Sequence, residues 1–193
     1  MRRVTVRGFM LPSEVDEARE WFIANINTPV FRSDKHQTSY TTRYTPDSNL
    51  PSVIDDVFGR VIKQFSFSPL CRKEITTDGS GVICLAQFSG AATPMHYDRK
   101  HSAQQDMSII RFNIVIEDAN GGVLSIENSE GDVVEYKAEV GELHAYNVSE
   151  FKHGVSSVAG RRFIVLFSMC VPYGEWEDGL IKYEGDLPCI EFI

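Results

Sequence analysis

A histidine and an aspartate lie two positions apart in this sequence, at His96 and Asp98. Alternate side chains of a β-strand point to the same face, so these two would lie side by side on a strand. An imidazole and a carboxylate can share one metal ion but leave it short of ligands, so a third ligand from another strand is needed. His153 is the natural candidate. The spacing therefore predicts a metal centre formed by His96, Asp98 and His153, with coordination positions left open for other molecules.

The pair His96 and Asp98 is a weak signal alone, because a histidine two residues before an aspartate is common by chance. The context strengthens it. Two histidines and one carboxylate on one side of a metal form the ligand set of non-haem Fe(II) oxygenases. After His153 come a predicted hairpin and the strand-like run Arg161–Leu166, which begins with two arginines. The order of these features indicates metal-dependent oxygen chemistry more specifically than the pair does.

The remaining histidines and a nearby glutamate are more simply explained as packed or solvated groups. His36 lies in a polar loop, His144 on a predicted strand, and Glu142 at a turn. His101 is the main rival ligand because Asp98 and His101 could build a different site. Its predicted loop position makes a preorganised site there less favourable.

Short apolar runs bounded by Gly, Asp, Asn and Ser follow Pro69 and predict antiparallel strands. Eight strands are expected, near residues 81–88, 93–98, 108–117, 122–127, 133–137, 142–146, 153–158 and 162–171. Tight turns are expected between them where Asn120 is followed by two glycines, and at Gly160.

Two helices are expected before these strands. Ser13 and Asp16 resemble a capping box that opens a helix over 14–26, and apolar residues recur at helical spacing over 52–64. The intervening stretch 27–51 is rich in Thr, Ser, Asn, Tyr and Pro and is predicted to be an irregular segment that could cover a site. These elements predict a mainly β (α+β) protein, a jelly-roll barrel supported by two or more N-terminal helices.

The length of 193 residues favours one domain, since about 150 residues is usual for one. We expect a helical N-terminal part over about 1–68, a barrel over about 69–173 and a C-terminal extension over about 174–193. The oligomeric state is not predicted.

Composition excludes several classes of protein. The chain is 42% hydrophobic and 24% charged, as ordinary globular proteins are. No apolar run reaches the roughly 18 residues of a membrane span, and no secretory signal is evident, so cytoplasmic residence is expected. The four cysteines form no CxxC pair and are expected to be free thiols. A net charge of −8 argues against general attraction to nucleic acid and favours small molecules or peptides as partners.

The order of His96, Asp98, His153 and an arginine-led strand resembles the Fe(II)/2-oxoglutarate-dependent oxygenases, particularly their prolyl-4-hydroxylase-like branch. The resemblance covers roughly Val82 to Cys170. The Gly-Gly turn in Asn120–Leu124 looks like the family's turn into a barrel strand. The segment 140–143 is similar to the one that precedes the strand before the distal histidine. This resemblance implies the double-stranded β-helix, the jelly-roll barrel of that family.

The resemblance also implies cofactors and roles. Fe(II) would be bound by the three predicted ligands, with 2-oxoglutarate as cosubstrate, O2 as oxidant and ascorbate as a further cofactor. Arg162 is nine residues after His153, where this branch has a basic residue for the far carboxylate of 2-oxoglutarate. Strand parity puts Arg161 and Arg162 on opposite faces that are both apolar enough for burial, so an exchange of roles stays open. The family spacing favours Arg162.

By resemblance, Arg111, Asn113 and Val115 would face the barrel interior from one strand. Asn113 is predicted to contact the cosubstrate, and Arg111 the substrate or the cosubstrate. A buried structural network is the alternative for both. Val115 stands where the family often has a tyrosine for the cosubstrate, so that hydrogen bond would be missing or supplied elsewhere.

The implied activity is hydroxylation of a C–H bond of an amino-acid residue, prolyl or other, free or peptidyl, with release of succinate and CO2. Asp98 argues against halogenation, since family halogenases have a small residue there. A nucleobase is the second choice of substrate, with phosphate contacts from basic residues at Arg72, Lys73, Arg99 and Lys100. Two further alternatives are a cupin-type metal enzyme that does not use 2-oxoglutarate and a binding module without catalysis.

Overall fold

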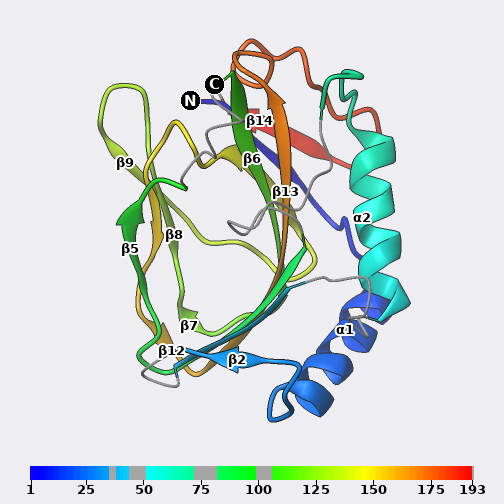
Figure 1. Ribbon diagram of the computed structural model, residues 1–193, viewed down its shortest axis with the longest axis vertical. Helices are drawn as coiled ribbons and strands as arrows, with labels where there is room; N and C mark the ends of the chain where they lie inside the picture. The colour runs from blue at the N-terminus through cyan, green and yellow to red at the C-terminus, as the bar shows by residue number, and fades with distance from the viewer. Residues whose placement is uncertain (35–37, 44–50, 72–81, 99–105, 193) are drawn as a thin grey trace.

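The computed structural model describes residues 1–34, 38–43, 51–71, 82–98 and 106–192. Two β-sheets face each other, and two helices cover the outer side of the larger one (Figure 1). His36, His101 and the four basic residues considered as phosphate contacts lie outside the described residues. So does the stretch 44–50 within the predicted covering segment.

The larger sheet has eight strands in the order β14-β1-β10-β6-β13-β4-β3-β2. Its strands are β1 (Arg3–Val6), β2 (Arg32–Ser33), β3 (Ser39–Arg43), β4 (Ile83–Phe88), β6 (Met107–Glu117), β10 (Leu143–Asn147), β13 (Arg161–Pro172) and β14 (Cys189–Phe192). Every pairing in it is antiparallel.

The smaller sheet has the order β5-β11-β8-β9, with strands β5 (Thr93–His96), β8 (Leu124–Glu127), β9 (Val133–Tyr136) and β11 (His153–Val155). A two-stranded ribbon of β7 (Asn120–Gly121) and β12 (Val158–Ala159) joins the sheets at one end. From β4 to β13 the chain passes repeatedly between the two sheets. This is the topology of a jelly roll, so the predicted fold class is confirmed.

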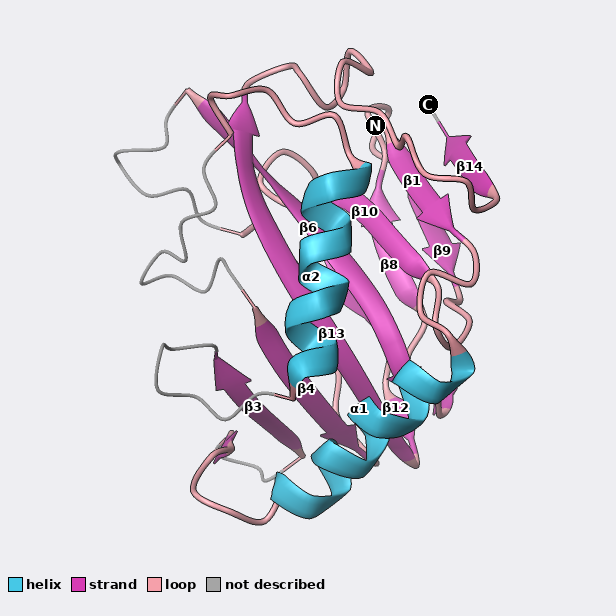
Figure 2. Ribbon diagram, turned by 90° about the vertical axis from the view of Figure 1, so that its right-hand side faces the viewer, coloured by secondary structure: helices cyan, strands magenta, loops and turns pink. Residues whose placement is uncertain are grey.

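The two helices, α1 (Pro12–Asn25) and α2 (Ser52–Gln64), lie across the outer face of the large sheet (Figure 2). Helix α2 has the predicted bounds. Helix α1 begins two residues earlier than expected, because Leu11 and not Ser13 is its N-cap. The Glu14 carboxylate accepts a hydrogen bond from the Leu11 backbone N–H at 2.8 Å, which satisfies one of the free donors at this helix end.

Aromatic side chains fill the space between the helices and the sheet. Phe22 of α1 stacks on Phe163 of β13 with ring centroids 4.7 Å apart, and Phe58 of α2 stacks on Phe167 at 5.2 Å. Burying such a side chain contributes about 1.5–3 kcal/mol. These contacts fix one face of β13 against the helices and leave its other face for the barrel interior.

Both ends of the described chain join the large sheet. β1 pairs with β10 on one side and with β14 on the other, which makes β10 an interior strand. The stretch before residue 69, expected to be mainly helical, therefore also supplies β1, β2 and β3. Where the chain is described, it contains no helix both long and apolar enough to cross a membrane.

Candidate metal centre

Two of the predicted ligands come from neighbouring strands of the small sheet, and the third follows one of these strands. His96 is the last residue of β5 and His153 the first of β11, and the two are directly paired across the strands. Asp98 follows β5, where its backbone N–H donates to the Val148 carbonyl at 2.9 Å. Strand pairing therefore brings together side chains that are far apart in the sequence.

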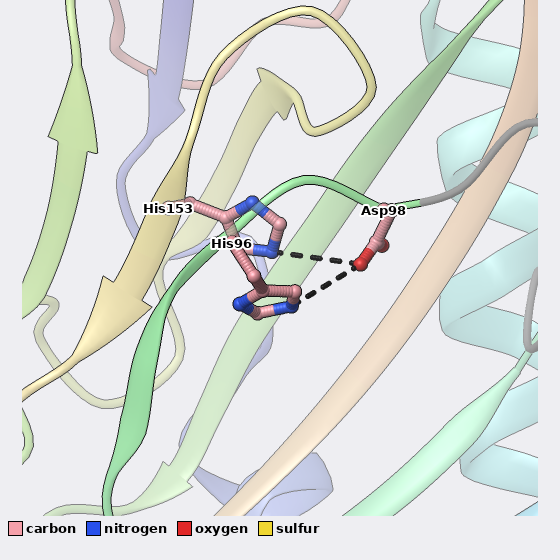
Figure 3. A group of neighbouring side chains, drawn as sticks. All are labelled: His96, Asp98 and His153. Atoms are coloured by element: carbon pink, nitrogen blue, oxygen red, sulfur yellow. Dashed lines mark ion pairs between the residues drawn. The ribbon is translucent and has the colours of Figure 1, made fainter.

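Ligand atoms of all three residues lie within 4.8 Å of one another (Figure 3). The Asp98 Oδ1 atom is 3.4 Å from His96 Nε2 and 3.8 Å from His153 Nε2. The two imidazole rings are 4.4 Å apart between centroids. Two nitrogen atoms and one oxygen atom thus converge on one point, as facial coordination of a metal requires.

The histidines are arranged to offer their Nε2 atoms. His96 Nδ1 lies 2.8 Å from the Pro94 carbonyl oxygen, which favours a proton on Nδ1 and a lone pair on Nε2. Burial lowers the pKa of His153 to about 4, against the opposing effect of Asp98. His153 is therefore neutral at pH 7, and a neutral imidazole is the form that binds metals.

The second carboxylate oxygen of Asp98 is already engaged. Arg111 of β6 donates a hydrogen bond from Nη2 to Oδ2, while Oδ1 faces the histidines. The arginine therefore holds the carboxylate so that one oxygen is directed toward the metal position.

A cavity of about 230 Å³ begins at these ligands and extends between the two sheets. Its lining includes Arg111, Asn113 and Val115, the three residues predicted to face the interior. Asn113 lies opposite Leu166 in the strand pairing, and Val115 lies opposite Ile164. Because Arg162 is two residues further along β13, the cavity runs from Arg111 beside the metal ligands toward Arg162.

Arg162 and Arg161 lie on opposite sides of β13. Arg162 lines the cavity, is 5% exposed and donates from Nη1 to the Gln87 side-chain oxygen at 3.0 Å. Its Nε has no hydrogen-bond partner among the described residues, and burial lowers the pKa of its guanidinium. Arg161 is exposed and forms two hydrogen bonds with the Glu117 carboxylate, at 2.6 and 2.9 Å.

The Gly-Gly turn makes room for the Arg162 side chain. Gly122 has φ +65°, and a Cβ there would lie 2.9 Å from Arg162 Cδ and 3.1 Å from its Nε. A side chain at this position would therefore collide with the arginine, in addition to the strain of a left-handed backbone conformation.

Tyr146 of β10 is a cavity residue that the sequence analysis missed. Asn113 Nδ2 donates to its hydroxyl oxygen at 2.8 Å, while Asn113 Oδ1 has no partner in the described part of the protein. Burial raises the pKa of Tyr146 to about 12, so it keeps its proton. The Tyr146 hydroxyl oxygen accepts a hydrogen bond from Asn113, so the hydroxyl proton remains available for a ligand. Tyr146 thus offers this donor from β10, whereas Val115 belongs to β6.

Gln87 was missed as well. Its signal is weak, since it is a single amide near the end of an apolar strand. Strand parity puts Tyr146 on the same face as His144, but only the structure shows that this face lines the cavity.

His144 belongs to a separate buried network. Its Nδ1 lies 3.0 Å from the Thr5 hydroxyl and its Nε2 lies 3.3 Å from Glu142 Oε2. Glu142 also accepts hydrogen bonds from the Tyr136 hydroxyl and the Glu139 backbone N–H, both at 3.0 Å. These residues bind one another and place no further ligand near His96.

No protein-family model matches the sequence, and no curated protein matches it. Solved structures do. A prolyl hydroxylase from Trichoplax adhaerens, in complex with a hypoxia inducible factor peptide fragment, has 14% identity and a TM-score of 0.62, covering 91% of this chain and 86% of that one. A 2OG-Fe(II) oxygenase family oxidoreductase from Burkholderia pseudomallei has 13% identity and a TM-score of 0.56, covering 83% and 79%. HygX from Streptomyces hygroscopicus, with nickel, 2-oxoglutarate and hygromycin B bound, has 11% identity and a TM-score of 0.62, covering 89% and 83%.

The chain has the fold of the 2OG-Fe(II) oxygenases. The double-stranded β-helix inferred from the sequence resemblance is thereby confirmed. In this oxygenase fold, two histidines and an aspartate converge at one end of the cavity, and a buried arginine lies further along it.

Proposed function

We propose that this protein is an Fe(II)- and 2-oxoglutarate-dependent dioxygenase that hydroxylates a C–H bond of an amino-acid residue. One observation carries the proposal: a convergent His96, Asp98 and His153 set and the buried Arg162 share one cavity. A binding module would need neither feature, and a cupin-type enzyme would not need a buried arginine.

The donor set fits Fe(II). Neutral imidazoles and a carboxylate suit this ion, and three ligands on one side leave positions for a cosubstrate and O2. His96, Asp98 and His153 would hold the metal, whose chemistry when bound is the activation of O2 at the expense of 2-oxoglutarate. Arg111 supports the set by engaging the carboxylate oxygen that faces away from the histidines.

The cavity suits a small dicarboxylate. Its volume of about 230 Å³ is below the roughly 300–1,000 Å³ of sites for drug-sized ligands. Arg162 would bind the far carboxylate of 2-oxoglutarate, since its Nε lacks a partner and a guanidinium can meet a carboxylate with two parallel hydrogen bonds. Asn113 and the Tyr146 hydroxyl would contact the same molecule, and Tyr146 would replace the tyrosine absent at Val115.

The balanced reaction consumes the substrate, O2 and 2-oxoglutarate and yields the hydroxylated substrate, succinate and CO2. One oxygen atom enters the new hydroxyl group and the other enters succinate. The described protein groups bind and orient the cosubstrate, and apolar residues such as Val115, Leu124 and Ile164 restrict water in the cavity.

An amino-acid residue is the preferred substrate class because a similar structure, the prolyl hydroxylase, was solved with a peptide. HygX was solved with hygromycin B, so a small molecule is also compatible with this fold. A nucleobase remains the alternative within the same fold, and ascorbate would support turnover.

Anaerobic addition of Fe(II) and 2-oxoglutarate tests the proposal. We expect a weak visible charge-transfer band from the chelate, and succinate formation after O2 is admitted. Absence of both with folded, reduced protein would refute the dioxygenase assignment. Turnover that does not depend on 2-oxoglutarate would favour the cupin-type alternative.

The two neighbouring arginines supply a matched pair of variants. Arg162→Ala should weaken 2-oxoglutarate binding at least about tenfold, as expected for loss of a charge-assisted contact. Arg161→Ala removes an exposed ion pair with Glu117 and a contact of the guanidinium with the Phe163 ring, 5.0 Å away, both on the side of β13 opposite the cavity, so it should leave that binding nearly unchanged. Calorimetric titration of both variants measures the difference, and equal losses would contradict the assignment of Arg162.

A further inference from the structure

Arg111 leaves the cavity with more positive charge than metal and cosubstrate binding require. The charged side chains that line it, within the described residues, are Asp98, Arg111 and Arg162. Among the histidines that line it, His96 and His153 would bind the metal as neutral imidazoles, and burial lowers the pKa of His144 to about 4, so none of the three adds a charge at pH 7.

The proposed ligands balance only part of this charge. A divalent metal with Asp98, Arg162 and the dianion of 2-oxoglutarate forms a neutral set. Arg111 adds one positive charge to it, and a charge removed from water is unfavourable unless an anion accompanies it.

The two carboxylates that act on lining groups from outside the cavity, Asp118 and Glu142, are already paired. The charge of Asp118 raises the pKa of Arg162, but Asp118 forms an ion pair with Lys137 at 3.2 Å. Glu142, behind His144, forms one with Arg7 at 3.5 Å. Neither offers a free negative charge to Arg111.

The Arg111 guanidinium also has unused donors. Its hydrogen bond to Asp98 comes from Nη2, whereas its Nε is buried without a hydrogen-bond partner in the described structure. The side chain is 12% exposed and lies directly across from Tyr146 in the β6 and β10 pairing, next to the metal ligands. A ligand at the metal end of the cavity can therefore reach it.

We propose that Arg111 binds a carboxylate group of the substrate, and that the substrate is a small carboxylic acid such as a free amino acid. This inference rests on the proposed function, because the remaining positive charge is assigned to the substrate only if the metal and 2-oxoglutarate occupy the positions given to them there. It favours a free acid over an internal residue of a peptide, whose backbone amides carry no charge.

Calorimetry on protein loaded with Ni(II) and saturated with 2-oxoglutarate tests this without turnover. The probes are the free L-amino acids and propionate, each paired with its carboxamide. At least one carboxylate should bind. Its amide should bind at least about tenfold more weakly, because it cannot form the hydrogen bond between charged groups that the carboxylate forms with Arg111. Equal binding of acid and amide, or no binding of any carboxylate, would overturn the proposal.

Two variants locate the effect at Arg111. Arg111→Gln should lose the carboxylate binding, whereas Arg111→Lys, which keeps the charge, should retain much of it. Because Arg111 also holds Asp98, Ni(II) loading and 2-oxoglutarate affinity are measured for each variant, and carboxylate binding is compared only at full occupancy of both. A loss of 2-oxoglutarate affinity in Arg111→Gln equal to that in Arg162→Ala would instead assign Arg111 to the cosubstrate. Failure of the unaltered protein to bind Ni(II) or 2-oxoglutarate would refute the proposed function itself.

Discussion

Arg162 reaches the cavity past a residue that has no side chain. Gly122 occupies the turn before β8, and the arginine side chain passes where its Cβ would be. A guanidinium buried at 5% exposure has little freedom to move aside, since Gln87 holds one of its nitrogen atoms. The glycine thus determines the position of a ligand-binding group on another strand.

Gly122→Ala should therefore impair cosubstrate binding. The new Cβ would displace Arg162, and we expect the affinity for 2-oxoglutarate to fall by about tenfold or more, as for a misplaced charge-assisted contact. Titration calorimetry on the metal-loaded variant measures this.

Gly131→Ala is the matched control. Gly131 also has a left-handed backbone, at φ +88°, but a Cβ there would meet nothing within 4 Å. Both variants carry a similar backbone strain of about 1–2 kcal/mol. Equal 2-oxoglutarate affinity in the two would show that Arg162 does not depend on the space at Gly122.

At the scale of elements, α1 supports the strand that carries Arg162. The ring of Phe22 is fully buried and stacks on Phe163, the residue directly after Arg162. Arg19, one turn earlier on α1, lies 3.7 Å from the Glu117 carboxylate that also binds Arg161. The helix thus contacts both strands that form this wall of the cavity.

Phe22→Ala should destabilise the protein strongly. Removing a buried phenylalanine typically costs about 3–5 kcal/mol, because apolar burial is lost and a void remains. Urea unfolding gives the change in the free energy of unfolding. Ile23→Ala, at the next position, should change it by less than about 0.5 kcal/mol, because Ile23 is 49% exposed. Comparable losses in both would mean that α1 does not pack as described.

At the scale of the whole molecule, His144 makes the free energy of unfolding depend on pH. Burial lowers its pKa to about 4, while in the unfolded chain it titrates near 6.5. Between these values the unfolded state binds the proton and the folded state does not. This contribution to stability is therefore complete above pH 6.5 and is lost as the pH falls toward 4.

His144→Gln should flatten that pH dependence. The variant lacks the titrating group, so the free energy of unfolding should fall less steeply from pH 6.5 to 4, by at most about 1.4 kcal/mol per pH unit. Urea unfolding in the presence of a chelator compares the two proteins, with the other histidines common to both. Identical slopes would contradict the buried, neutral state of His144.

Much of this organisation could be predicted from sequence because it follows from local periodicity. Helix α2 and the main barrel strands followed from apolar spacing, whereas the inward position of Asn113 came from the family resemblance. Other features depend on contacts between distant segments. Parity alone could not choose between Arg161 and Arg162, since both faces of β13 are apolar. The hydrogen bond of Tyr146 to Asn113 depends on the register of β10 against β6, and the addition of β1 and β14 to the sheet depends on long-range pairing. No local pattern encodes these.

The outermost strands of the eight-stranded sheet are short. β2 has two residues and β14 has four, whereas the central strands β6 and β13 have eleven and twelve. A second polypeptide chain that paired with either edge strand would find few unpaired backbone donors and acceptors there. The long strands that form the cavity wall are thereby shielded from intermolecular sheet extension and amyloid-like self-association.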